Sequence, residues 1–182
     1  MLDRKYRILF LIQLPPPVHG VSTVNHQVFH SERIKREYCT DLIEIKFSQK
    51  IDQLRRLSLI KIFHFLKICV LLALKMYRFK PDRVYFSLIP VGIGFYRDVI
   101  FVSIIKFFQG KIIFHLHNRG IAERSVSFIK QKIYMFVFNN SDIIHLSSNL
   151  IVDEFIDLKL KNTSFHVVPN GVDVEKIKTV RE

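Results

Sequence analysis

Cysteine is scarce in this chain of 182 residues. Cys39 and Cys69 are the only two, and they lie far apart in the sequence. A small scaffold held together by disulfide bonds is therefore excluded, and we interpret both side chains as reduced thiols of a cytoplasmic protein. Apolar residues make up 49% of the chain and charged residues 24%, which is enough to build one domain around a core and excludes a disordered protein.

Long apolar runs are also lacking. The run that follows Arg7 is only about seven residues long before it meets three prolines, too short for the apolar region of a signal peptide. Between residues 57 and 77, charged and histidine side chains leave 68–74 as the longest clean stretch. A spanning helix needs about 20 apolar residues, so we predict no transmembrane helix.

Acidic residues are few compared with basic ones. The chain has 16 Asp and Glu against 28 Lys and Arg, which gives a formal net charge of +12. Such an excess predicts an anionic partner, and nucleic acid, an anionic membrane surface and a phosphorylated small molecule all qualify.

Short apolar runs alternate with helical patterns along the whole chain. Runs that are apolar throughout and separated by helices predict a mostly parallel, doubly wound α/β sheet of the Rossmann-like type. Ligands of such sheets bind beyond the carboxyl ends of the strands, which directs attention to loops 15–22, 89–97, 117–125 and 146–149. The predicted strands are 7–14, 42–47, 82–88, 111–117, 142–146 and 164–168. The predicted helices are 22–36, 54–79, 97–108, one that ends near 139, and 148–158.

The loop between the first strand and the first helix is a candidate phosphate site. Gly20 allows the backbone to approach an anion, and the amides of Val21 and Ser22 would open the helix, with Ser22 as its capping residue. The loop has neither dinucleotide-binding nor P-loop spacing, so an ordinary strand-to-helix turn is the alternative.

The segment 167–173, Val-Val-Pro-Asn-Gly-Val-Asp, is the most specific string in the sequence. It predicts the end of a strand followed by an Asn-Gly turn. Together with the opening loop, it resembles the N-terminal domain of glycosyltransferase family 4, the group 1 family of retaining GT-B enzymes. Members open with a strand and P-x-x-G-G and close this domain with P-N-G-[IV]-D, which Pro169–Asp173 matches fully. At the opening, His19 stands in place of the first glycine.

This resemblance implies a domain organisation. Residues 1–168 would form the acceptor-side Rossmann-like domain, and 169–182 the start of a linker hinged at Pro169, Asn170 and Gly171. A second domain would hold most contacts to a nucleotide-sugar donor and an E-x7-E motif, neither of which is present. We therefore expect this 182-residue chain, a truncated form or the product of a split gene, to be inactive alone. No cofactor is implied.

Two histidines mark the end of the fourth predicted strand. The resemblance implies that His117 lies near the reacting sugar, where it would bind a hydroxyl or, when protonated, stabilise the departing phosphate. His115 lies deeper in the strand, and we interpret it as a core residue. Metal binding by the pair is disfavoured, because no third ligand is obvious.

Polar residues of the neighbouring loops are candidate acceptor contacts. Arg97, Asn118 and Arg119 are predicted in loops at the same edge, where a guanidinium could bind an acceptor phosphate. Solvated loop charge is the alternative.

The predicted helix 54–79 combines an apolar face with basic residues that share one arc of roughly 140°. This pattern favours contact with an anionic membrane, with an ordinary core-packed helix as the alternative. The basic arc holds Arg56, Lys61, His64, Lys67, Lys75 and Arg78.

These observations predict half of a retaining glycosyltransferase of cell-surface polysaccharide or glycolipid synthesis. Its partners would be a nucleotide-sugar donor, a sugar or lipid-linked acceptor and the inner face of the plasma membrane. Half of a sugar-nucleotide epimerase and a non-catalytic basic module are the alternatives. Nucleic acid is not expected as a partner, because the 17 phenylalanines lie mostly in apolar runs and leave no stacking platform.

Overall fold

A computed structural model describes residues 5–45 and 59–169, which form one six-stranded sheet in the order β2-β1-β3-β4-β5-β6. Every neighbouring pair of strands is parallel, so the predicted fold class is confirmed. The strands are β1 (Arg7–Ile12), β2 (Cys39–Glu44), β3 (Arg83–Phe86), β4 (Ile112–His115), β5 (Ser141–His145) and β6 (Ser164–Val167).

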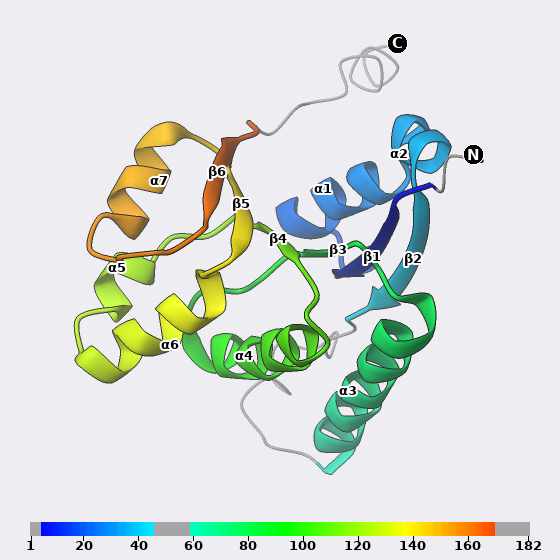
Figure 1. Cartoon of the computed structure of the whole chain (residues 1–182), viewed down its shortest axis with the longest axis horizontal. Helices are drawn as coiled ribbons and strands as arrows, with labels where there is room; N and C mark the ends of the chain where they lie inside the picture. The colour runs from blue at the N-terminus through cyan, green and yellow to red at the C-terminus, as the bar shows by residue number, and fades with distance from the viewer. Residues whose placement is uncertain (1–4, 46–58, 170–182) are drawn as a thin grey trace.

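Helices cover both faces of the sheet, as a doubly wound layer requires. In Figure 1, α1 and α2 lie on one side of the sheet, and α3, α4 and α6 lie on the other. The helices are α1 (Gly20–Phe29), α2 (Glu32–Glu37), α3 (Leu59–Phe79), α4 (Gly92–Phe107), α5 (Ile121–Arg124), α6 (Phe128–Phe138) and α7 (Ser148–Phe155).

The alternation of side chains along the strands divides the core in two. Val84 and Phe86 point into the larger cluster beneath α3, α4 and α6, whereas Tyr85 between them packs with Phe10 in the smaller cluster under α1 and α2. Burial on both faces explains why the strands are apolar throughout.

The first predicted helix is corrected in two respects. It begins at Gly20 and is capped by His19, so the prediction of Ser22 as the capping residue is wrong. The imidazole Nδ1 of His19 accepts from the Ser22 amide at 3.3 Å, and the Ser22 Oγ accepts from the His19 amide at 3.0 Å. The helical segment also ends at Phe29 and restarts at Glu32, which makes two helices.

The helix after β3 starts earlier than predicted, at Gly92 instead of Arg97. The glycine-rich start allows close packing, because a Cβ at Gly94 would lie 3.3 Å from the Ile89 side chain. Phe95 is buried against the Tyr134 ring, with centroids 4.4 Å apart. Arg97 therefore lies inside α4, and its predicted loop position is wrong.

Helix α3 ends at Phe79 as predicted, and residues 54–58 at its predicted start lie outside the described residues. Within 5–45 and 59–169, no helix is at once long and apolar enough to span a bilayer. Cys39 and Cys69 are both free thiols.

Removing a core aromatic ring should strongly destabilise the sheet. Phe114 is fully buried, and we expect Phe114→Ala to lower the free energy of unfolding by about 3–5 kcal/mol, through lost transfer energy and the cavity left behind. Phe107 at the end of α4 is 81% exposed, so the same truncation there is the matched control. Urea unfolding measures both, and equal losses would contradict the assignment of the core.

Candidate functional site

The direction in which the chain adds strands to the sheet reverses at β1. From β1 the chain crosses to β2 on one side, and it then returns to β3 on the other side of β1. In an open parallel sheet this topological switch point opens a crevice at the carboxyl ends of the strands. The segments that follow β1, β3, β4 and β5 all meet at this edge.

Three histidines lie at or just beyond the ends of the neighbouring strands β4 and β5. His115 and His145 close β4 and β5 and are buried, and His117 lies two residues beyond His115, with the two rings 4.1 Å apart. Among the described residues, the Nε2 atoms of all three are buried without a hydrogen-bond partner. Buried polar atoms are rarely left unpaired, so each of these nitrogens marks a position where a water or a ligand can supply a hydrogen-bonding partner.

The other ring nitrogens define the chemistry of two of these histidines. The Leu146 amide donates to Nδ1 of His145 at 2.8 Å, so the neutral ring carries its proton on Nε2 and presents an unused donor. Nδ1 of His115 is hydrogen-bonded to the Tyr85 hydroxyl, which agrees with the interpretation of His115 as a core residue but leaves Nε2 unsatisfied.

All three imidazoles are neutral near pH 7. Burial, with the neighbouring histidines in support, lowers the pKa of His115 to about 3. Burial and His145 lower the pKa of His117 to about 4. Burial also lowers the pKa of His145, against the opposing effect of Glu154. Neutral rings suit hydrogen bonds to uncharged hydroxyl groups better than ion pairs with phosphate.

A buried carboxylate from α7 shapes the loop after His117. Oε2 of Glu154 accepts from the amides of Gly120 at 2.8 Å and Ile121 at 2.5 Å, and thereby caps the short helix α5. Gly120 has φ +119°, and a Cβ there would lie 2.7 Å from the Val91 side chain, so only glycine fits. This segment had been predicted as a loop throughout, and α5 corrects that prediction.

Helix α7 also forms ion pairs with Arg119. Its guanidinium lies 2.5 Å from the Asp153 carboxylate and 3.8 Å from that of Glu154, while the side chain stays 62% exposed. Asn118 beside it is exposed. The structure thus brings Asn118 and Arg119 together with His117 on one segment.

Arg97 is not on the segment of His117 but in helix α4. It lies in α4, where its guanidinium bonds Oδ1 of the fully buried Asp98 at 2.5 Å and lies over the Phe101 ring. Burial raises the pKa of Asp98 to about 6, although Arg97 and the Ile89 amide oppose the shift.

The start of α1 supplies the candidate phosphate loop. The first amides of a helix have no partner within it, and Gly20 and Val21 provide two of them. The third, from Ser22, is already bonded by His19. A Cβ at Gly20 would meet no atom within 4 Å, so open space lies before this turn.

Of the predicted hinge, Pro169 is described and exposed, whereas Asn170 and Gly171 lie outside the described residues. Sequence reasoning missed two residues of the site, His145 and Glu154. His145 could have been found, because it closes an apolar strand as His115 does. No sequence pattern identifies Glu154 as a residue of the site, because the amides that it binds lie more than thirty residues away in the chain.

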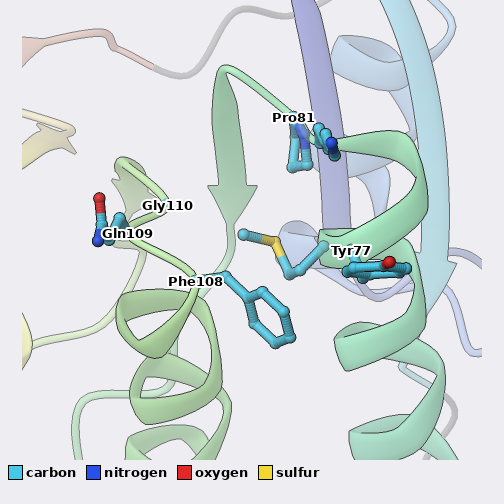
Figure 2. A pocket seen from close by; sticks show the side chains of 7 residues that line it. Tyr77, Pro81, Phe108, Gln109 and Gly110 are labelled. Carbon is cyan, nitrogen blue, oxygen red and sulfur yellow. The ribbon is translucent and has the colours of Figure 1, made fainter.

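Two hollows of the described structure are not lined by any of these histidines. A cavity of about 290 Å³ (Figure 2) lies between the carboxyl ends of α3 and α4, beside Tyr77, Pro81 and Phe108, at the opposite edge of the sheet. A smaller one of about 80 Å³ lies between the start of α4 and α6, beside Arg124 and Lys130. Within the part of the chain that the structure describes, no three side chains of His, Cys, Asp or Glu converge to hold a metal ion.

The chain was compared with protein-family models, with curated proteins and with solved structures. No protein-family model matches the chain, and no curated protein matches it in sequence. The crystal structure of Acinetobacter baumannii MurG is similar to it, with a TM-score of 0.43 and 12% identity over 88% of this chain and 46% of that chain. This chain therefore spans about half the length of that structure. The likeness concerns the arrangement of strands and helices and not the chemistry.

The buried histidines should make the fold sensitive to acid. Their pKa values are lowered in the folded state, so the unfolded chain binds protons first as the pH falls below about 6.5, and stability is lost toward pH 4. We expect His117 to account for a loss of at most about 2 kcal/mol between pH 7 and 5. Urea unfolding across this range should show a shallower loss for His117→Gln than for the wild type. His30→Gln, on the exposed end of α1, is the control, and equal pH slopes in both variants would contradict the burial of His117.

Proposed function

We propose that this chain is the acceptor-side half of a two-domain retaining glycosyltransferase, which transfers a sugar from a nucleotide donor to a hydroxyl group. The observation that carries the proposal is the set of neutral histidines with unused Nε2 atoms at the carboxyl edge of the sheet. The resemblance of Pro169–Asp173 to the end of a GT-B N-terminal domain supports it. In this organisation 1–168 is the domain, 169–182 begins the linker, and the donor domain is a separate part.

His117 is the proposed catalytic residue. With a pKa lowered to about 4, its ring is neutral and available to hydrogen-bond a sugar hydroxyl, and this role is favoured over that of a cation beside the phosphate. A hydrogen bond in a closed cleft is stronger than in water, because the dielectric constant is lower. Closure of a second domain over this edge would also exclude water and suppress hydrolysis of the donor.

The start of α1 is the proposed contact to the donor diphosphate. The amides of Gly20 and Val21 and the positive end of the helix dipole face the carboxyl edge, while Ser22 holds the turn through His19. Retaining transfer requires stabilisation of the departing diphosphate, and preorganised amides supply part of it. The donor domain would supply the remaining contacts, and no cofactor is required.

Asn118 and Arg119 are the proposed acceptor contacts nearest to His117. Asp153 and Glu154 balance much of the charge of Arg119 and fix its position, which suits a neutral sugar as well as a phosphorylated acceptor. Arg97 remains a predicted acceptor contact that domain closure would have to bring into reach. A glycolipid or polysaccharide precursor at the inner face of the plasma membrane is the acceptor that we propose.

The test is transfer of labelled sugar from the common UDP- and GDP-sugars to membrane-lipid extracts, by this chain joined to its donor domain. Transfer with retained configuration is expected. Interconversion of the free sugar nucleotide without transfer would indicate an epimerase instead, and salt-sensitive binding to nucleic acid without either reaction would indicate a binding module.

The chain alone should bind donors weakly or not at all. Most contacts to the nucleotide belong to the second domain of the proposed organisation, and two helix amides cannot hold a nucleotide sugar. Titration calorimetry of the 182-residue chain against UDP- and GDP-sugars measures this directly. Micromolar affinity would overturn the placement of the donor site.

In the two-domain enzyme, His117→Ala should lower kcat by about ten- to a thousandfold, which corresponds to a loss of about 1.4–4 kcal/mol of transition-state stabilisation. The fold should survive, because the residue follows the end of β4. His30→Ala, at an exposed helix end, should turn over like the wild type. Normal turnover of the His117 variant would remove this residue from the mechanism.

A further inference from the structure

Helix α3 exposes a continuous apolar stripe. In a helix, residues three and four apart lie on one face, and Phe63, Leu66, Val70, Leu74 and Tyr77 have this spacing. Their side chains are between 45% and 69% exposed. A single exposed apolar residue is ordinary, but a stripe that runs the length of a helix of 21 residues requires an explanation.

The two helices beside α3 extend this stripe into a surface. α4 packs against α3 and α6 packs against α4, on the side of the sheet opposite α1 and α2 (Figure 1). Both expose large apolar side chains, with Ile93 at 87%, Phe107 at 81% and Ile129 at 72%. The exposed apolar residues of α4 and α6 are Ile93, Tyr96, Ile100, Phe107, Phe128, Ile129 and Phe136.

The same three helices carry no exposed carboxylate. α3 and α6, as described, contain no Asp or Glu, and the single acid of α4, Asp98, is fully buried. Basic side chains occur on all three, and at the surface Lys132 lies over the Phe128 ring. Lys106 lies over the Phe136 ring but is half-buried, and its ammonium donates to the backbone carbonyls of Phe136 and Asn139. By contrast, α2 carries both acidic and basic side chains, and α7 carries Asp153 and Glu154.

We propose that the outer faces of α3, α4 and α6 dock on an anionic bilayer, with their apolar side chains inserted at the level of the lipid headgroups. An apolar surface with basic and no acidic side chains is complementary to anionic lipid, which attracts the cations and accepts the apolar groups. A second copy of the chain fits less well, because two such surfaces would bring like charges together in molecules of net charge +12. This inference does not depend on the proposed glycosyl transfer.

The docking surface differs from the basic arc predicted for 54–79. Lys75 is ion-paired with Asp41 of β2 and does not belong to the outer face, and Arg56 lies outside the described residues. Lys67 and Arg78 are exposed beside the apolar stripe. Insertion of apolar side chains is therefore as necessary for binding as the charge.

The surface also reaches the edge of the sheet that holds the histidines. α4 begins just after β3, so Ile93 and Tyr96 lie at the carboxyl end of that strand. Docking through α4 would bring that edge to the lipid headgroups.

Two valines provide a matched test. Val70 in α3 is 59% exposed and Val152 in α7 is 57% exposed, and only Val70 lies on the proposed surface. Binding is measured by co-sedimentation of the 182-residue chain with vesicles of phosphatidylcholine containing about one third phosphatidylglycerol, which supply the negative surface potential. We expect Val70→Asp to weaken binding at least tenfold and Val152→Asp to bind like the wild type. Pure phosphatidylcholine vesicles, or high salt, should also weaken binding.

A variant on a second helix tests whether weakened binding of the Val70 variant reflects the whole surface and not a local disturbance of α3. Phe107→Ser at the end of α4 should weaken binding in the same direction, and its circular dichroism should match that of the wild type, because the ring is exposed. Equal binding of the Val70 and Val152 variants would overturn the proposal. It would also be overturned if light scattering showed a dimer that Val70→Asp dissociates while anionic vesicles bind none of the proteins.

Discussion

The parallel pairing of β1 with both β2 and β3 is the constraint on which the rest of the structure depends. It places β1 inside the sheet, next to the edge strand β2, and reverses the direction in which successive strands are added. Right-handed crossovers then send α1 and α2 to one face and α3, α4 and α6 to the other. The reversal also opens the crevice at the carboxyl edge, where the start of α1 meets the loops that follow β3, β4 and β5.

Burial keeps the histidines at the carboxyl edge of the sheet neutral. The histidines that end β4 and β5 are taken out of water by the sheet around them, which keeps the rings neutral and leaves their Nε2 atoms unsatisfied. An unsatisfied buried polar group costs about 1–3 kcal/mol, which a hydrogen bond to a ligand or a bound water would offset. Glu154 completes the arrangement, because its carboxylate fixes the turn at Gly120 and positions Arg119.

The two helical layers present different surfaces. α1 presents its first turn to the crevice, whereas α3, α4 and α6 bury one side against the sheet and expose apolar and basic residues on the other. α4 connects the two regions, since it begins at the carboxyl edge and continues along the outer surface. A membrane-bound acceptor and a site at this edge are geometrically compatible for that reason.

The sequence by itself determined the six strands, most of the helices between them and the parallel sheet, because strands buried on both faces must be apolar throughout. It also placed His117, Asn118 and Arg119 at a strand end. Only the tertiary structure decided that His19 caps α1, that Arg97 lies within α4 beside Asp98, and that Glu154 caps α5. It also decided that α3 turns an apolar stripe outward and pairs Lys75 with Asp41. These features depend on contacts between distant residues and on which side of each helix meets the sheet, and neither can be inferred from local patterns of hydrophobicity and charge.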